Sequence, residues 1–160
     1  MDDAKRMASI CWSSDLDRVW PTLILATTGA ASGMEVDILF TFWGLRVLQK
    51  NDTWITGNNW MQKAEALVDR GGTDHLKLGK INFAGAGTKM IKALASEHKV
   101  ASPTELLEMA IDLGVRLHPC QMTMELYGLT KDDFIEGIQP PSGAANFINL
   151  AIDADISLFI

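Results

Sequence analysis

Two β-rich runs joined by one helical segment open the chain. The run Met7 to Trp12 is short and apolar, and the Ser-Ser-Asp that follows it is typical of a strand leading into a helix cap. Ser14 and Asp17 have the spacing of a capping box at the start of that helix. The predicted helix ends before Gly33, and a β-branched and aromatic run, Met34 to Thr41, follows directly. Two strands connected by a helix predict parallel pairing in one sheet.

The rest of the chain continues this alternation. The clearest helix is Pro103 to Leu113, where Ser102 and Glu105 form a capping box around a proline at the first helical position. A third strand, two helices and a last strand are then predicted, at residues 115–118, 121–127, 144–152 and 156–160.

We therefore predict an α/β fold, a three-layer Rossmann-like (flavodoxin-like) domain with a mainly parallel sheet of about five strands. The 160 residues suit a single domain, residues 1–160. Residues 51–87 are rich in Gly, Asn and Asp without sustained periodicity, so we expect a long irregular insertion there.

Charge and apolar patterning exclude two classes of partner. The net charge is −6 and no cluster of Lys and Arg occurs, which argues against nucleic acid. The N-terminus lacks the pattern of a signal peptide, so we expect a cytoplasmic protein. The most apolar stretch, Val19 to Ala31, is too short to span a membrane, and no membrane association is predicted.

The cysteines and histidines do not have the spacing of a metal site. Cys11 and Cys120 are far apart and form no Cys-x-x-Cys pair, so neither a disulfide framework nor zinc is indicated. Residues 85–89, Gly-Ala-Gly-Thr-Lys, lack the spacing of a phosphate loop and are interpreted as a plain loop. We predict no metal and no cofactor, and we place Cys11 in the core.

Cys120 is the candidate for chemistry. It stands where a strand gives way to a helix, and unpaired N–H groups at a helix N-terminus favour a thiolate. The helix end supplies only about 0.3 to 2 kcal/mol, so a second contribution is needed, and a protonated His118 would give it. The alternative interpretation is that Cys120 is a buried cysteine that fills space.

Other candidate binding residues surround this predicted strand end. Trp43 follows the second strand, at the edge of the sheet where ligands gather in α/β folds. We predict that Trp43 and Met122 wall a thiol pocket, and that Gln121 and Ser13 also contribute to binding there.

Several motifs carry a resemblance to a known family. "FTFWGL" at 40–45, "CQMTMELYGL" at 120–129 and the closing "LFI" resemble the DsrE/DsrF/DsrH-like family, in the branch with Phe-Phe-Thr-Phe-Trp-Gly and Cys-Gln-Met-Ser-Met motifs. The likeness also includes "SSDLDR" at 13–18 and "KINFAGAGTKMIKAL" at 80–94. Thr123 stands where the family often has serine.

The resemblance implies a Rossmann-like subunit of a homo-oligomer whose cysteine carries sulfur as a persulfide between donor and acceptor proteins. Cys120 matches the family cysteine. The first hypothesis is therefore a sulfur carrier or sulfurtransferase that uses Cys120. The alternative is a non-catalytic small-anion-binding or scaffold subunit of a DsrE-type oligomer, in which Cys120 is incidental.

Two further classes are less well supported. A disulfide oxidoreductase normally needs a second, resolving cysteine, and Cys11 is predicted to be buried. An inactive subunit that only completes an oligomer would not need the cysteine that this chain retains at position 120.

Overall fold

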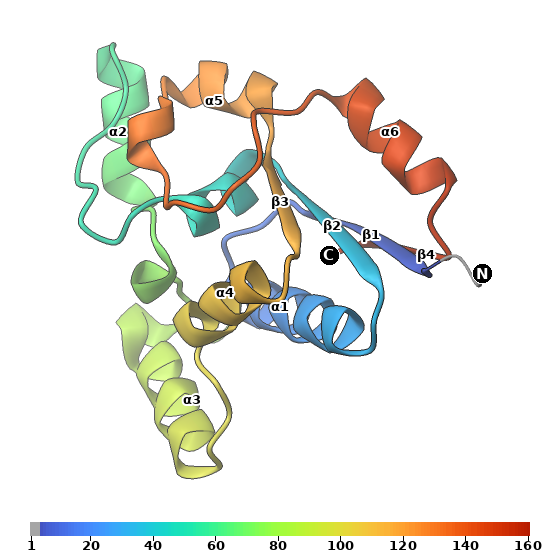
Figure 1. The fold of residues 1–160 in the computed structure, drawn as a ribbon. Helices are drawn as coiled ribbons and strands as arrows, with labels where there is room; N and C mark the ends of the chain where they lie inside the picture. Colours follow the sequence, from blue (N-terminus) through green and yellow to red (C-terminus); the bar gives the residue numbers. More distant parts are fainter. Residues whose placement is uncertain (1–3) are drawn as a thin grey trace.

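The computed structural model describes residues 4–160 and contains one sheet of four parallel strands in the order β3-β2-β1-β4, with helices on both faces (Figure 1). The strands are β1 (Arg6–Cys11), β2 (Glu35–Phe40), β3 (Arg116–Pro119) and β4 (Ile156–Phe159). The predicted α/β class is confirmed. The sheet has four strands where about five were predicted: each of the four strands expected from the sequence forms, and within residues 4–160 no further strand pairs with them. The segment after β2 forms the 3-10 helix η1 (Phe42–Leu48).

The first strand, helix and strand form the unit that the sequence predicts. β1 pairs with β2 in parallel, with Cys11 opposite Phe40 at the carboxyl end. Helix α1 (Leu16–Ala31) connects the two strands and buries one apolar stripe against them. The predicted capping box is wrong: Ser14 bonds to the Asp69 carboxylate at 3.1 Å, and Asp17 accepts a hydrogen bond from the N–H of Gly79. Both side chains attach the start of α1 to a distant segment.

Helix α4 (Pro103–Asp112) packs beside α1 on the same face of the sheet (Figure 1). Its predicted capping box is confirmed. The Ser102 hydroxyl accepts from the N–H of Glu105 at 3.2 Å, and the Glu105 carboxylate accepts from the N–H of Ser102 at 2.7 Å. These bonds fix where the helix begins and hold the pKa of Glu105 below its ordinary value.

The other face of the sheet is covered by α6 (Ala144–Ile152), which has the predicted bounds. Its inward side chain, Phe147, is buried against Ala8, Leu39 and Cys120. Helix α5 (Gln121–Tyr127), also as predicted, follows β3 directly. The carboxyl edge of the sheet is therefore bordered by the starts of α1, η1 and α5.

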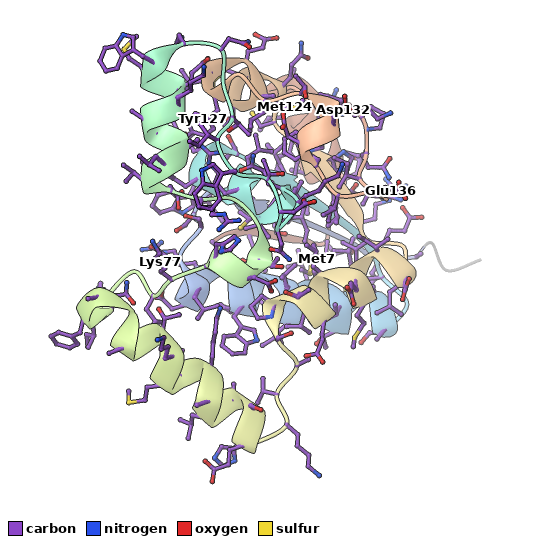
Figure 2. The ribbon with its side chains drawn as sticks, turned by 90° about the vertical axis from the view of Figure 1, so that its left-hand side faces the viewer. Met7, Lys77, Met124, Tyr127, Asp132 and Glu136 are labelled. Atoms are coloured by element: carbon purple, nitrogen blue, oxygen red, sulfur yellow. The ribbon has the colours of Figure 1, made fainter. Side chains whose placement is uncertain are left out.

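Residues 51–87 are not irregular throughout, and that prediction is wrong for α2 (Trp60–Val68). This helix begins at a capping box formed by Asn59 and Gln62. It buries only Ala66, and its larger apolar side chains are exposed although their spacing is helical. The chain continues through 3-10 turns at Thr73–His75 and Phe83–Gly85 into α3 (Ala86–Glu97), and a last 3-10 turn, η4 (Lys131–Asp133), follows α5. Viewed from the left-hand side of Figure 1, α2 and α3 lie at opposite ends of the molecule with Lys77 between them (Figure 2).

A buried arginine attaches α2 to the body of the domain. Arg46 of η1 is 1% exposed; its guanidinium pairs with Glu65 of α2 and donates to the Gln49 side chain at 2.9 Å. The same group stacks 4.9 Å from the centre of the Tyr127 ring in α5. Burial lowers the pKa of Arg46 from its ordinary value. One cation therefore joins η1, α2 and α5.

Candidate functional site

Cys120 lies at the carboxyl end of β3 and at the first, capping position of α5. Its N–H donates to the Phe40 carbonyl at 2.9 Å, which continues the pairing of β3 with β2 by one residue. Its own carbonyl accepts the first helical hydrogen bond, from the N–H of Met124 at 3.0 Å. The sequence predicts this change from strand to helix, and it points unpaired N–H groups toward the cysteine.

The environment of the Cys120 thiol favours its ionised form. Burial alone would raise the pKa of this thiol, because the residue is only 7% exposed. The hydroxyls of Thr123 and Thr41 and the N–H groups of Thr123 and Met122 oppose burial, and the pKa lies below its ordinary value. The Cys120 side chain makes no regular capping hydrogen bond at the start of α5. The lowering of its pKa is therefore divided among several donors.

Thr123 lies at the Cys120 thiol and was not among the site residues predicted from the sequence. It is fully buried, its hydroxyl oxygen accepts from the N–H of Phe42 at 3.1 Å, and it lies 3.2 Å from the Thr41 hydroxyl. Phe42 follows the end of β2 directly and has a φ of 47°, in the left-handed region. A threonine three positions after the cysteine lies on the same side of a helix as the capping residue. That spacing is the signal by which Thr123 could have been found.

A cover lies over the other side of Cys120. The N–H of Gln121 donates to the Ser142 carbonyl at 3.1 Å, and the N–H of Ser142 donates to the Pro119 carbonyl at 2.8 Å. The ring of Phe147 packs against Cys120 one turn into α6. The segment 140–143 and the start of α6 therefore close over the thiol.

His118 is paired with a carboxylate, whereas the sequence analysis expected it beside the thiol. Its Nε2 lies 2.7 Å from an Asp37 carboxylate oxygen, and its side chain is buried. Among the described residues, the groups that shift the pKa of Cys120 do not include His118. The hydroxyls of Thr123 and Thr41 lower the pKa of Cys120, the effect that was predicted for this histidine.

His118 instead ends a row of charged groups across three strands. The Arg116 guanidinium donates to both oxygens of Asp37, at 2.8 and 2.7 Å, and to Glu35 at 3.2 Å. Arg6 pairs with Glu35 at 3.6 Å. Burial would raise the pKa of Asp37, but Arg116 and His118 outweigh it and lower this pKa to about 2. The row joins β1, β2 and β3 on the face that α6 covers in part.

We expect the Asp37 carboxylate to make the stability of the folded state depend on pH in the acid range. A carboxyl group with a pKa lowered to about 2 stabilises the folded state above its unfolded pKa of about 4, and this contribution is lost as the pH falls toward 2. Urea unfolding should therefore show a midpoint that falls between pH 4 and pH 2. In Asp37→Asn the midpoint should be lower at pH 7 and should fall less over that interval.

Asp112→Asn, which changes an exposed carboxylate at the end of α4, is the matched control and should retain the wild-type acid dependence. An Asp37→Asn profile parallel to that of the wild type would show that the row of charges does not contribute to acid sensitivity.

Ser13 and Trp43 lie together, but apart from Cys120. They line a depression of about 420 Å³ at the carboxyl end of β1, together with Trp12, Asp69 and Lys77. The Trp12 and Trp43 rings meet edge to face at 6.3 Å, and Ser13 accepts from the N–H of Asp15. Burial raises the pKa of Asp69. Cys120 does not line this depression. The depression therefore gives no support to the predicted thiol pocket with Trp43 as a wall.

Gln121 and Met122 lie on the exposed side of α5. Gln121 donates to the Glu125 side chain at 3.1 Å, one helical turn on, and the Met122 side chain extends into solvent. They adjoin Cys120 along the chain and present a surface to an approaching molecule. Their predicted binding role stays a prediction.

Cys11 is confirmed as a core residue. It is fully buried, its thiol donates to the Ser13 carbonyl at 3.6 Å, and burial raises its pKa to about 12. A thiol in this state is a poor nucleophile. The chemistry of thiols in this chain therefore concentrates on Cys120.

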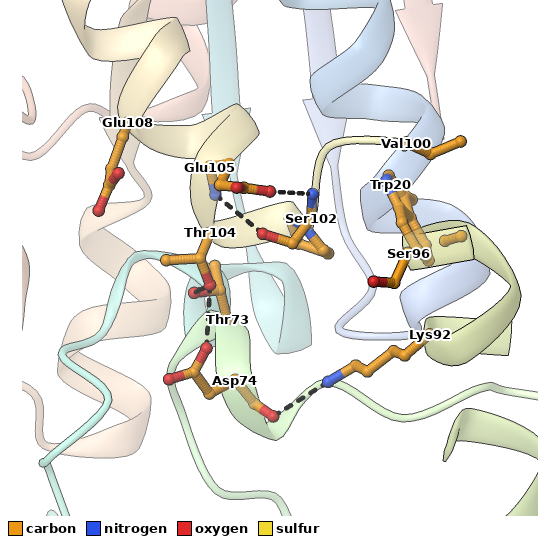
Figure 3. A pocket seen from close by; sticks show the side chains of 12 residues that line it. Trp20, Thr73, Asp74, Lys92, Ser96, Val100, Ser102, Thr104, Glu105 and Glu108 are labelled. Carbon is orange, nitrogen blue, oxygen red and sulfur yellow. Dashed lines mark hydrogen bonds between the residues drawn. The ribbon is translucent and has the colours of Figure 1, made fainter. Parts of the chain in front are cut away.

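A separate depression of about 540 Å³ lies between α3 and α4, away from the carboxyl edge (Figure 3). Its polar residues are hydrogen-bonded to one another. The Thr73 and Thr104 hydroxyls lie 2.7 Å apart, and Thr104 donates to the Asp74 carboxylate at 3.0 Å. Lys92 donates to the Asp74 carbonyl at 3.2 Å. These bonds attach α3 to α4 and contain no predicted site residue.

Within residues 4–160, no group of three or more His, Cys, Asp and Glu side chains is arranged to hold a metal ion. In the same part of the chain, no helix combines the length and apolar character needed to cross a membrane.

Comparisons of sequence match nearly the whole chain. Residues 3–159 match the model of the DsrE/DsrF/DrsH-like family. The uncharacterized protein YrkE of Bacillus subtilis is 35% identical over 159 residues, covering 99% of both chains. The sulfur carrier protein DsrE2 of Allochromatium vinosum is 35% identical over 161 aligned positions, again covering 99% of both.

Comparisons of structure support the fold. The ychN protein of E. coli superposes with a TM-score of 0.61 at 9% identity, and 98% of this chain and 99% of that one are covered. MTH1491 of Methanobacterium thermoautotrophicum, a protein of unknown function, gives a TM-score of 0.56 at 13% identity with the same coverage.

Proposed function

Since the chain belongs to the DsrE/DsrF/DrsH-like family, we propose that it is a sulfur carrier that relays sulfane sulfur as a persulfide on Cys120. The observation that carries this proposal is the thiol at the start of α5, where two hydroxyls and two N–H groups lower its pKa. The relative from Allochromatium vinosum, named as a sulfur carrier, supports a role in sulfur relay.

The proposed relay consists of two thiol exchange steps. The Cys120 thiolate attacks the outer sulfur of a donor persulfide, forms a new S–S bond and releases the donor thiolate. The thiolate of an acceptor protein then attacks the outer sulfur on Cys120, takes it as its own persulfide and restores the Cys120 thiolate. No net oxidation or reduction occurs, so neither a metal nor a redox cofactor is required, and one cysteine is sufficient.

The neighbouring residues have distinct roles in this proposal. Thr123, Thr41 and the first N–H groups of α5 stabilise the anion on either sulfur, while Gln121 and Met122 contact the donor or acceptor. The cover formed by 140–143 and α6 moves aside when a partner delivers sulfur, because Cys120 is only 7% exposed. We propose that the chain acts as a homo-oligomer in the cytoplasm, where thiols are kept reduced.

The burial of Cys120 also favours a second candidate, a scaffold or small-anion-binding subunit in which the thiol takes no part. Alkylation by iodoacetamide near neutral pH separates the two. In a carrier, iodoacetamide should modify Cys120 while the protein is folded, whereas in a scaffold it should modify Cys120 only after unfolding.

The direct test is intact-mass analysis after exposure to polysulfide. The wild type should gain mass in steps of one sulfur atom that a reductant removes, and Cys120→Ser should gain none. Cys11→Ala is the matched control: it should take up sulfur as the wild type does, because Cys11 is sealed in the core. Equal uptake by Cys120→Ser and the wild type, or no uptake by either, would refute the relay.

A further inference from the structure

The depression at the carboxyl end of β1 is lined by two opposite charges that form no ion pair in the part of the chain that the structure describes. Asp69 is half-buried and accepts a hydrogen bond from the neutral Ser14 hydroxyl at 3.1 Å. Lys77 lines the same depression, and the remaining charged group there, Asp15, pairs with Arg18 at 3.7 Å. A carboxylate that is partly removed from water is usually paired, so Asp69 offers a place for a cation and Lys77 a place for an anion.

The main chain holds Asp69 and Lys77 near each other without contact. Asp69 is the residue that ends α2. The Lys77 carbonyl accepts from the N–H of Leu16 at 2.8 Å, which attaches this segment to the start of α1. Burial raises the pKa of Asp69. The Ser14 hydroxyl and the charges of Arg46 and Lys77 oppose this rise, so the lysine is close enough to act on the carboxylate.

An indole ring gives the depression an apolar wall. Trp43 lines it and is 45% exposed. The Trp12 ring meets Trp43 edge to face at 6.3 Å, and the Arg18 guanidinium lies 4.9 Å from the centre of the Trp12 ring. Arg18 therefore occupies one face of Trp12, and Trp43 remains the open aromatic surface.

The place and the size of the depression suit a small ligand. The strand order reverses at β1, because β2 and β3 lie on one side of it and β4 lies on the other (Figure 1). In open α/β sheets, ligands bind at the carboxyl ends of the strands where the order reverses. The volume of about 420 Å³ lies within the range of small-molecule sites, roughly 300 to 1,000 Å³. Cys120 does not line the depression, so this site is distinct from the thiol.

We propose that the depression binds a free amino acid with an aromatic side chain, as its zwitterion. The ammonium group of the ligand pairs with Asp69, its carboxylate pairs with Lys77, and its ring packs against Trp43. Opposite charges on one carbon atom suit two protein charges that lie near each other, and a ligand with a single charge leaves one of them unpaired. The proposal does not depend on sulfur relay by Cys120.

The test is isothermal titration calorimetry with L-phenylalanine and analogues that each lack one group. L-Phenylalanine should bind with a Kd below about 1 mM. Phenethylamine lacks the carboxylate, 3-phenylpropionate lacks the ammonium group, and glycine lacks the ring. Each should bind roughly tenfold more weakly, or weaker still, because one charged hydrogen bond or the ring contact is lost.

Two variants assign each charge to its partner. In Asp69→Asn, the affinity for L-phenylalanine should fall to that for 3-phenylpropionate, and in Lys77→Met it should fall to that for phenethylamine. Lys80→Met is the matched control, because it removes an exposed lysine three positions along the chain and outside the depression. This control and Cys120→Ser should both bind L-phenylalanine like the wild type.

Three results would overturn the proposal. They are a wild type that binds no L-phenylalanine up to about 10 mM, a wild type that binds all four compounds equally, and an Asp69→Asn variant that still prefers L-phenylalanine to 3-phenylpropionate as the wild type does. The comparison of the four compounds uses the wild type alone and needs no variant to fold. Sulfur uptake is measured separately by mass, so failure of this site and failure of the relay are distinguished.

Discussion

Thr123→Val should slow the reaction of Cys120 with iodoacetamide at pH 7 by between about twofold and tenfold, the rate equivalent of one hydrogen bond of about 0.5 to 1.5 kcal/mol. Valine keeps the shape of threonine and removes the hydroxyl that lowers the pKa of the thiol. As the pKa of Cys120 rises, the fraction of thiolate at neutral pH falls. The measurement is the rate of alkylation as a function of pH, whose midpoint should move upward.

Thr123→Ser is the matched control, because it retains the hydroxyl that accepts from the N–H of Phe42. Its pH profile should stay close to that of the wild type. If the valine variant reacts at the same rate and with the same midpoint as the serine variant, the hydroxyl does not stabilise the thiolate, and the donors of the main chain act without it.

Glu65→Ala should lower the free energy of unfolding by about 3 to 5 kcal/mol, the usual effect of leaving a buried charge without its partner. Arg46 is 1% exposed, and Glu65 supplies the carboxylate with which its guanidinium pairs. Without it, Arg46 retains only neutral acceptors, the side chains of Gln49 and Thr56. Urea unfolding followed by circular dichroism gives the difference.

Glu108→Ala, which removes an exposed carboxylate from α4, is the control and should change stability by about 0.5 kcal/mol or less. If Glu65→Ala lowers the free energy of unfolding by no more than the control does, then α2 detaches without cost and lets water reach Arg46. The connection of α2 with η1 and α5 through one cation would then be wrong.

The parts of the fold that the sequence predicts are those whose signals are local. The strand, helix and strand at the start of the chain, the capping box of Ser102 and Glu105, and the bounds of α5 and α6 all depend on residues a few positions apart. Helix α2 has an equally local signal in Asn59 and Gln62. It was missed because stretches rich in Gly, Asn and Asp flank it on both sides, although its apolar residues have helical spacing.

The site was less predictable because its contacts join distant segments. The sequence places Cys120 at a helix start, and this holds. Its partners Thr41 and Thr123 are far apart in the chain, and only the alignment of β2 with β3 brings them together. His118 has its expected position along the strand, but Asp37 on the neighbouring strand binds it, and nothing in the local pattern indicates that pair.

The main chain on both sides of Cys120 is fixed, through its own N–H to Phe40 and through the N–H of Gln121 to Ser142. A second sulfur lengthens the side chain by about 2 Å, and the backbone cannot shift to make room for it. If Cys120 carries sulfur as proposed, the added atom is therefore positioned by rotation about the Cα–Cβ bond and not by movement of the main chain, and it turns either toward the hydroxyls of Thr41 and Thr123 or away from them.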